Sequence, residues 1–174
     1  MNEKVKEIFK TIFTYAVIIL IVIVIRLFFV DPVRVDGHSM DTTLQNGEIM
    51  LLNKIVYRRH DINRFDIVVI KGNNKLIIKR VIGLPNETIE YKDNVLYING
   101  EKLDDPYPST NTDDFTIQDI GHVKIPGDTY FVMGDNRSDS LDSRYPQVGV
   151  INKSQILGRA RIIIWPFNRI SIVK

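Results

Sequence analysis

The sequence contains no cysteine, and this absence excludes cysteine proteases, thiolate zinc sites and disulfide scaffolds. None of its 174 residues falls in an HExxH motif, a phosphate-binding P-loop or a dinucleotide fingerprint. We therefore expect neither a metal nor a cofactor. Histidine is also scarce: the chain has three, and His60 and His122 lie in charged or loop-forming stretches where we expect no catalytic role.

Most of the chain also lacks an excess of charge of either sign. It holds 23 basic and 21 acidic residues, and residues 1–30 take four of the basic and two of the acidic ones. The rest of the chain therefore contains 19 of each. Because a domain without a basic stripe has little attraction for phosphates, we expect no nucleic-acid partner.

Only one long hydrophobic run is present, at residues 11–30. Apart from two threonines, a tyrosine and Arg26, it consists of aliphatic residues, phenylalanine and alanine, and its 20 residues make enough helix to cross a bilayer. Three lysines precede the run. By the positive-inside bias, residues 1–10 are predicted to be cytoplasmic and the remainder extracytoplasmic, in a single-pass protein of the cell membrane.

A cleaved secretory signal peptide has a similar charged start and apolar middle. Bulky residues at positions 27–30, however, occupy the place where a cleavage site needs small side chains. We therefore interpret residues 11–30 as an uncleaved transmembrane anchor. Arg26 lies near the outer end of this anchor, where its long side chain can reach the membrane interface.

Beyond the anchor, short apolar or alternating runs are separated by turn residues, as is typical of strands. No long helical period occurs there, so the predicted fold is mainly β, with an antiparallel catalytic domain. Residues 31–84 and 125–174 are predicted to form its core, and residues 85–124 a small hairpin-and-loop insertion, with a long loop at 102–122. The predicted strands are 33–35, 49–52, 67–70, 76–82, 88–91, 95–98, 130–133, 158–165 and 170–173.

Three stretches carry candidate chemistry, and the first is a turn bounded by Gly37. Glycine permits a sharp backbone path there, which leaves the hydroxyl of Ser39 with little steric cover. A serine in such a turn often does no more than cap it. His38 precedes Ser39 directly, and neighbours in an extended segment point to opposite sides, so we do not expect its imidazole to reach the Ser39 hydroxyl.

The second stretch is the strand around Lys79, which is apolar on both faces. Ile77 and Val81 share the face of Lys79, whereas Arg80 points the other way. Desolvation lowers the pKa of an ammonium, and a neutral lysine can take the proton of a serine hydroxyl. The pattern therefore allows a Ser-Lys dyad, although a lysine at a strand edge can also extend into solvent.

The third stretch, residues 134–144, reads GDNRSDSLDSR. A calcium loop starting at Asp135 would place Ser140 at the required glycine and Pro146 at the bidentate glutamate, so that interpretation fails. Opposite charges at short spacing indicate instead a loop held by its own ion pairs.

Four boxes, SMDTTL at 39–44, RFDIVV at 64–69, KRVIGLP at 79–85 and GDNRSDSLDSR at 134–144, occur together in this order. In this combination the sequence closely resembles the bacterial type I signal peptidases, particularly the single-span form of Gram-positive bacteria. The resemblance covers the anchor and nearly all the rest. It implies a membrane-bound serine endopeptidase that removes signal peptides from exported preproteins after a small-x-small motif, through an acyl-enzyme.

The resemblance also implies roles for individual residues. Ser39 would be the nucleophile, with its backbone N–H in the oxyanion hole, and Lys79 the general base. Ser140 would supply the hydroxyl that orients Lys79, and Gly37 would be the glycine of the serine turn. Two ion pairs would support the site, namely Arg80 with Asp135 and Asp142 with Arg144. Shallow pockets for small side chains would be lined by apolar residues, namely Val33, Val35, Met40, Leu44, Ile77 and Ile78.

The implied substrate lies as an extra strand between the serine segment and the lysine strand. Membrane lipid and exported preproteins are the expected partners, and we expect a monomer in the membrane. Tethering at the outer surface would raise the effective concentration of the enzyme on sites emerging there.

Two positions depart from the family pattern: Thr42 replaces the usual proline, and Gly37 stands where some relatives have serine. A membrane-tethered β-domain that binds exported chains without cutting them therefore remains an alternative. A self-cleaving repressor-type protein is a weaker one, because the chain offers an anchor in place of a DNA-binding segment.

Overall fold

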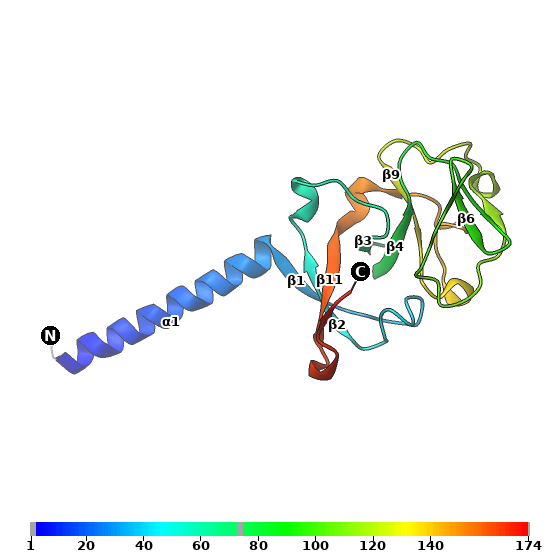
Figure 1. Ribbon diagram of the computed structural model, residues 1–174. Helices are drawn as coiled ribbons and strands as arrows, with labels where there is room; N and C mark the ends of the chain where they lie inside the picture. The colour runs from blue at the N-terminus through cyan, green and yellow to red at the C-terminus, as the bar shows by residue number, and fades with distance from the viewer. Residues whose placement is uncertain (1–2, 73–74, 174) are drawn as a thin grey trace.

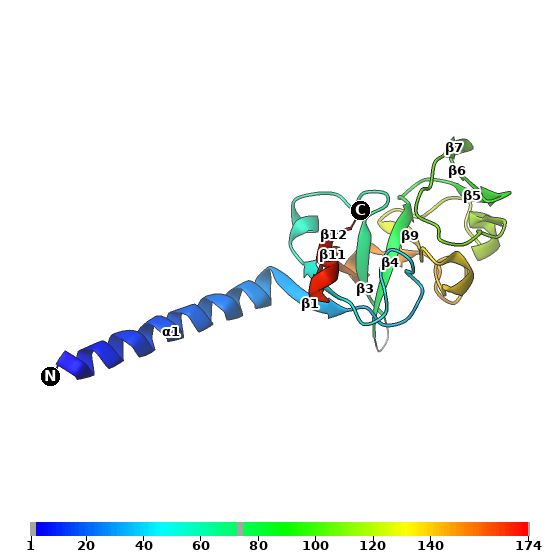
Figure 2. The same cartoon turned by 60° about the horizontal axis from the view of Figure 1, so that its bottom comes forward.

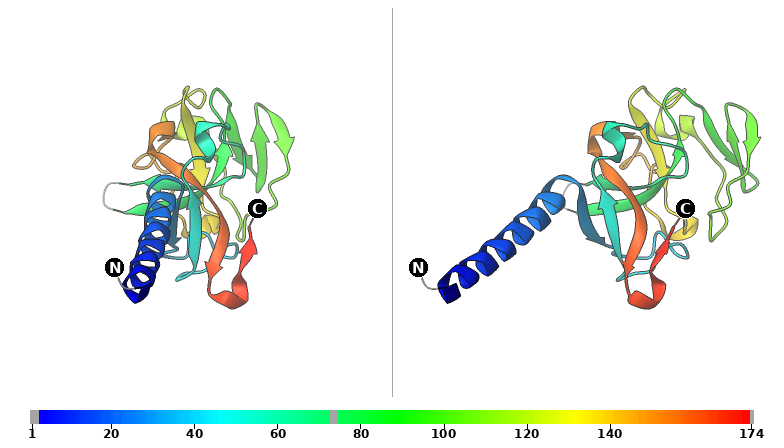
Figure 3. Two further views of the ribbon diagram at one scale, coloured as in Figure 1. Left: turned by 90° about the vertical axis from the view of Figure 1, so that its left-hand side faces the viewer. Right: turned by 60° about the vertical axis from the view of Figure 1, so that its left-hand side comes forward.

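The computed structural model describes residues 3–72 and 75–173. A single long helix, α1 (Glu3–Phe28), projects from a β-rich body without folding back on it (Figures 1 and 3). Within the described residues it is the one helix long and apolar enough to cross a membrane, and none of its side chains is buried against the body. It begins earlier than predicted and ends two residues earlier, because Val30 already pairs in the sheet.

The body is built on an eight-stranded sheet in which β1 follows α1 directly. The order is β1-β2-β11-β3-β4-β9-β10, with β12 paired to β11, and every neighbouring pair is antiparallel. Register shifts along β11 bend this strand as it crosses the sheet. The strands are β1 (Val30–Arg34), β2 (Ile49–Asn53), β3 (Ile67–Lys71), β4 (Leu76–Gly83), β9 (Thr129–Met133), β10 (Ile151–Asn152), β11 (Ile156–Trp165) and β12 (Ser171–Ile172).

A second sheet of four strands lies between β4 and β9 in the sequence and at the far end of the body from α1 (Figure 2). Its order is β7-β6-β5-β8. The strands are β5 (Ile89–Lys92), β6 (Val95–Ile98), β7 (Glu101–Leu103) and β8 (Phe115–Thr116). Whether residues 85–124 behave as a separate insertion stays a prediction.

The predicted loop at residues 102–122 is more ordered than its composition indicates. It contains the end of β7, β8 and a short 3-10 helix, η2 (Ile117–Ile120). Phe115 and Ile117 are buried in the core of the small sheet, where Phe115 pairs with Tyr91. Two buried apolar residues are thus enough to fix a segment that otherwise reads as polar loop. The remaining 3-10 helices are η1 (Val56–Arg58), η3 (Arg137–Asp139), η4 (Lys153–Gln155) and η5 (Phe167–Arg169).

The apolar residues divide into packed clusters that connect the sheets. One cluster joins β1, β2, β3 and β11 and includes Met50 and Ile163, both fully buried. Another lies between the small sheet and the β4–β9 pair and includes Ile82 and Phe131. The prediction of a mainly antiparallel β fold behind an apolar N-terminal helix is confirmed.

Candidate active site

The β4 strand has one half-open edge. On one side it pairs with β3 from Leu76 to Arg80, but on the other side β9 pairs only with Arg80, Val81 and Gly83. Among the described strands, none pairs with the edge at residues 76–79. That edge faces residues 34–40 across a groove of about 420 Å³. An exposed strand edge beside a groove is suited to receive an extended peptide.

Ser39 and Lys79 both line this groove. Lys79 is 4% exposed, and its Nζ donates a hydrogen bond to Ser140 Oγ at 3.0 Å. Burial lowers the pKa of Lys79 from 10.5 to about 8, an effect that the negative charges of Asp142 and Asp135 oppose. At pH 7 about a tenth of this lysine is therefore uncharged and able to accept a proton, far more than for a lysine at its ordinary pKa.

The turn that carries Ser39 is held by bonds from a distant loop. The Asn136 backbone N–H donates to Ser39 O at 3.1 Å, and its side-chain Nδ2 donates to His38 O at 3.1 Å. Gly37 has φ of +97°, which favours glycine, and its N–H donates to Asn46 Oδ1 at 3.1 Å. Hydrogen bonds therefore hold the backbone on both sides of Ser39.

Two ion pairs involve carboxylates of the 134–144 loop. Arg80 and Asp135 are fully buried and form a bidentate pair, with Nε–Oδ1 at 2.8 Å and Nη2–Oδ2 at 2.7 Å. Arg144 Nε lies 2.9 Å from Asp142 Oδ1, and the other oxygen of Asp142 accepts from Gly134 N–H at 3.1 Å. Asp135 thus connects the lysine strand to the 134–144 loop, and Asp142 joins two parts of that loop to each other.

Comparison with known proteins assigns nearly the whole chain to one family. The family model described as "Signal peptidase, peptidase S26" matches residues 6–165. The chain belongs to the signal peptidase family. It is 43% identical to signal peptidase I of Bacillus amyloliquefaciens, covering 91% of this chain and 90% of that protein. It is 40% identical to signal peptidase I S of Bacillus subtilis, covering 95% and 94%.

A more distant relative and a solved structure agree with this assignment. Signal peptidase IB of Staphylococcus aureus is 36% identical over 94% of this chain and 92% of its own. The crystal structure of a signal peptidase I from Enterococcus faecalis V583 superposes with a TM-score of 0.52 at 37% identity, covering 57% of this chain and 97% of that one.

In this member of the family, four of the six residues predicted to form substrate pockets line the groove: Val35, Met40, Ile77 and Ile78. The other two do not. Leu44 is fully buried and Val33 is 5% exposed, and both pack in the core cluster that contains Val35, Met40 and Ile78. These two residues therefore stand behind the groove residues and contact them from the core.

Arg137 and Asn136 are site residues that sequence reasoning did not single out. The Arg137 guanidinium is buried and donates to Tyr91 Oη at 2.8 Å, Thr112 Oγ1 at 2.9 Å and Asp105 Oδ2 at 2.6 Å, which ties the site loop to the small sheet. Both residues lie in the charged stretch 134–144. Their partners, however, are up to 98 positions away, so local sequence gives no sign of these contacts.

The imidazole of His38 contacts Asp41, three residues further along the chain. Its Nδ1 lies 3.0 Å from Asp41 Oδ2, and 61% of its side chain is exposed. The imidazole is thus engaged with Asp41 at the rim of the groove.

Proposed function

We propose that this protein is a membrane-bound serine endopeptidase that removes signal peptides from exported preproteins after a small-x-small motif. The observation that carries the proposal is the buried Lys79, with its lowered pKa and its bond to Ser140, in the same groove as Ser39. Membership of the signal peptidase family supports the same activity.

In the proposed reaction, neutral Lys79 Nζ takes the proton of Ser39 Oγ, which attacks the carbonyl carbon of the scissile bond. The Ser39 backbone N–H stabilises the oxyanion, since the Gly37 N–H is engaged by Asn46. The tetrahedral intermediate collapses to an acyl-enzyme as the Lys79 ammonium protonates the leaving amine, the new N-terminus of the mature protein. Lys79 then takes a proton from water, whose oxygen attacks the ester carbon. As the bond from that carbon to Ser39 Oγ breaks, the Lys79 ammonium returns the proton to Oγ, and the signal peptide leaves with a free carboxylate.

The substrate would bind as a strand between residues 34–40 and the half-open edge of β4. Its main chain would then hydrogen-bond to both walls, while alternate side chains point into the groove. The groove residues Val35, Met40, Ile77 and Ile78 bring aliphatic and thioether surface to this space. Shallow apolar walls of this kind favour small side chains at the two positions that point inward.

For α1 we propose the orientation with its N-terminus in the cytoplasm and the β-rich body outside the membrane. Lys4, Lys6 and Lys10 lie at the N-terminal end of the helix, in agreement with the positive-inside bias. We further propose that the protein acts as a monomer, with one groove in each copy.

The proposal is tested with the purified intact chain in lipid vesicles and a preprotein whose signal ends in Ala-x-Ala. We expect cleavage directly after the second alanine, identified from the mass and the N-terminal sequence of the mature product. A chain that binds the preprotein and never cuts it would instead support the tethered binding domain, and Thr42→Pro would then test whether the missing proline is the cause.

Gly134 offers a sharp test of the site geometry. A Cβ added at this position would lie 2.3 Å from Ser39 O and 2.4 Å from Ser140 Oγ, so Gly134→Ala must push the two apart. Because small displacements of reacting groups cost about 10²-fold in rate, we expect a loss of that order in kcat/KM. Gly127→Ala is the control, since a Cβ there meets nothing within 4 Å. Equal activity of the two variants would contradict this geometry.

A further inference from the structure

The anchor helix enters the catalytic sheet without a flexible linker. α1 ends at Phe28 and β1 begins at Val30, so one residue separates them (Figure 1). Beyond β1 the pairing continues, because Val35 N–H donates to Glu48 O at 2.8 Å and Gly47 N–H donates to Val35 O at 2.9 Å. The path from the helix to the turn of Ser39 is therefore hydrogen-bonded strand. Ser39 lies eleven positions after Phe28, a reach of at most about 40 Å.

Lys54 holds the junction between the helix and the sheet. Its Nζ donates to the carbonyl oxygens of Arg26 at 3.1 Å and Leu27 at 3.3 Å, two of the carbonyls that a helix end leaves without a partner in the helix. The same ammonium lies 2.5 Å from Asp31 Oδ2 in β1. A cation at this end also opposes the negative pole of the helix dipole. One side chain thus contacts both the last turn of the anchor and the first strand of the body.

The backbone around Lys54 is fixed as well. Its N–H donates to Phe29 O at 3.0 Å, and Asn53 Oδ1 accepts from the N–H groups of Ile55 and Val56, both at 3.1 Å. Val56 is buried at the start of η1. The turn that carries Lys54 is therefore held by hydrogen bonds, and the Lys54 side chain extends to the helix end from a fixed backbone.

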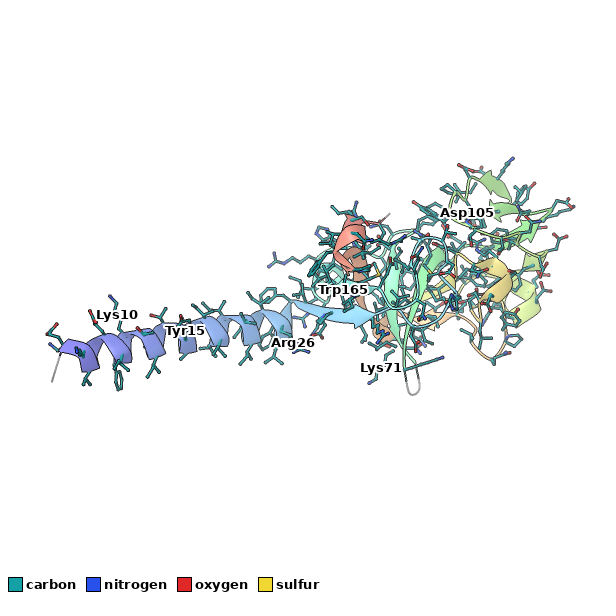
Figure 4. The ribbon with its side chains drawn as sticks, turned by 90° about the horizontal axis from the view of Figure 1, so that it is seen from below. Lys10, Tyr15, Arg26, Lys71, Asp105 and Trp165 are labelled. Carbon is teal, nitrogen blue, oxygen red and sulfur yellow. The ribbon has the colours of Figure 1, made fainter. Side chains whose placement is uncertain are left out.

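A second contact crosses the junction. Arg26 Nε lies 3.8 Å from Asp31 Oδ1, and Figure 4 shows Arg26 at the end of α1 where the helix meets the body. The side chain expected to reach the membrane interface thus also faces the first strand. Asp31 therefore contacts a positively charged side chain on each side of the junction, Arg26 on the helix and Lys54 in the β2–η1 turn.

We propose that Lys54, with Asp31, is a positioning residue that fixes the height and tilt of the groove above the bilayer and so selects which peptide bond of a membrane-inserted preprotein is cut. The inference rests on the proposed function. A preprotein spans the membrane and presents its cleavage site at a set distance from its own hydrophobic segment. Because the enzyme is anchored in the same bilayer, a rigid junction limits which bond can reach Ser39. A loose junction would let the body tilt and accept several bonds.

The test compares two substrates for the full chain in vesicles of phosphatidylethanolamine and phosphatidylglycerol. One is a soluble Ala-x-Ala peptide without a hydrophobic segment, and the other is a membrane-inserted preprotein with two Ala-x-Ala sites three residues apart. Lys54→Met keeps the length of the side chain and removes its donors. We expect kcat/KM for the soluble peptide to stay within about twofold and the ratio of cutting at the two sites to change by about threefold to tenfold.

Lys54→Arg should restore the wild-type ratio, because a guanidinium can donate to the same carbonyls. Lys92→Met, which removes an exposed lysine at the end of β5, should leave the ratio unchanged. An unaltered ratio in Lys54→Met, with both substrates still cut, would overturn the inference and leave the proposed function standing. Failure of the wild-type chain to cut either substrate would refute the proposed function itself.

The junction can also be measured without any cleavage. The chain lacks cysteine, so Val22→Cys in the anchor and Lys153→Cys on the body introduce a unique pair of spin-label sites, both exposed. In vesicles we expect a narrow distribution of label distances for this pair and a broader one when Lys54→Met is added. Distributions of equal width would show that Lys54 does not hold the helix, whatever the protein cuts.

Discussion

Lys79→Met is expected to lower kcat/KM for an Ala-x-Ala substrate by about 10³-fold or more, because it removes the proposed general base without changing the size of the side chain greatly. Ser39→Ala should have a comparable effect, and the double variant should be little worse than either single one, since the two residues act on the same proton. Peptide cleavage followed by mass spectrometry measures all three. A Lys79→Met variant with more than a tenth of the wild-type rate would contradict the dyad.

The pH dependence of kcat/KM tests the same proposed base without a mutation. The pKa of Lys79 is lowered to about 8 by burial, and only the uncharged form can accept the serine proton. As the pH falls below about 8, the uncharged fraction drops tenfold per unit, so kcat/KM at pH 6 should be about a hundredth of its value on the alkaline plateau. At higher pH the activity should rise and level off.

Circular dichroism at each pH serves as the control, because a loss of structure would also lower the rate. A profile that stays flat down to pH 6 would contradict a lysine base. An inflection near pH 6.5, in the ordinary range for histidine, that disappears in His38→Gln would transfer the role of base to His38.

Asp135→Asn is expected to destabilise the folded protein by about 3 kcal/mol, since it removes the Asp135 carboxylate charge from beside the buried Arg80 guanidinium. Both side chains of this pair are fully buried. Asp135 also accepts from Thr43 Oγ1 at 2.6 Å, so the substitution disturbs the turn after Ser39 as well. Urea unfolding in detergent, followed by the fluorescence of Trp165, measures the change.

Asp113→Asn is the matched control, because this carboxylate is exposed and its removal should change the free energy of unfolding by no more than about 0.5 kcal/mol. Adding Arg80→Met to Asp135→Asn should recover part of the lost stability, as the buried guanidinium charge is then removed as well. If Asp135→Asn costs less than about 1 kcal/mol, the buried pair contributes little and another contact holds the loop.

Local sequence was sufficient to predict the long helix and most of the strands of this fold, but not β7, β8 or β10. An apolar run of 20 residues can only be satisfied as a buried or membrane-spanning helix, and the alternating runs beyond it match strands β2 to β6 closely. The apolar flanks of Lys79 likewise predict its desolvation, because residues two apart in a strand share a face. In each case the physical signal lies within a few residues of the feature it predicts.

The tertiary structure decided what depends on distant partners. β8 forms because Phe115 pairs with Tyr91. Leu44 and Val33 do not line the groove because they pack in the core. Asn136 hydrogen-bonds to His38, which lies 98 positions earlier in the chain. Lys54 is the strongest example, since nothing in its neighbourhood in the sequence indicates the helix end 27 residues earlier. Such contacts follow from strand order and register. These bring together side chains that are far apart in the sequence and that no local sequence pattern relates to each other.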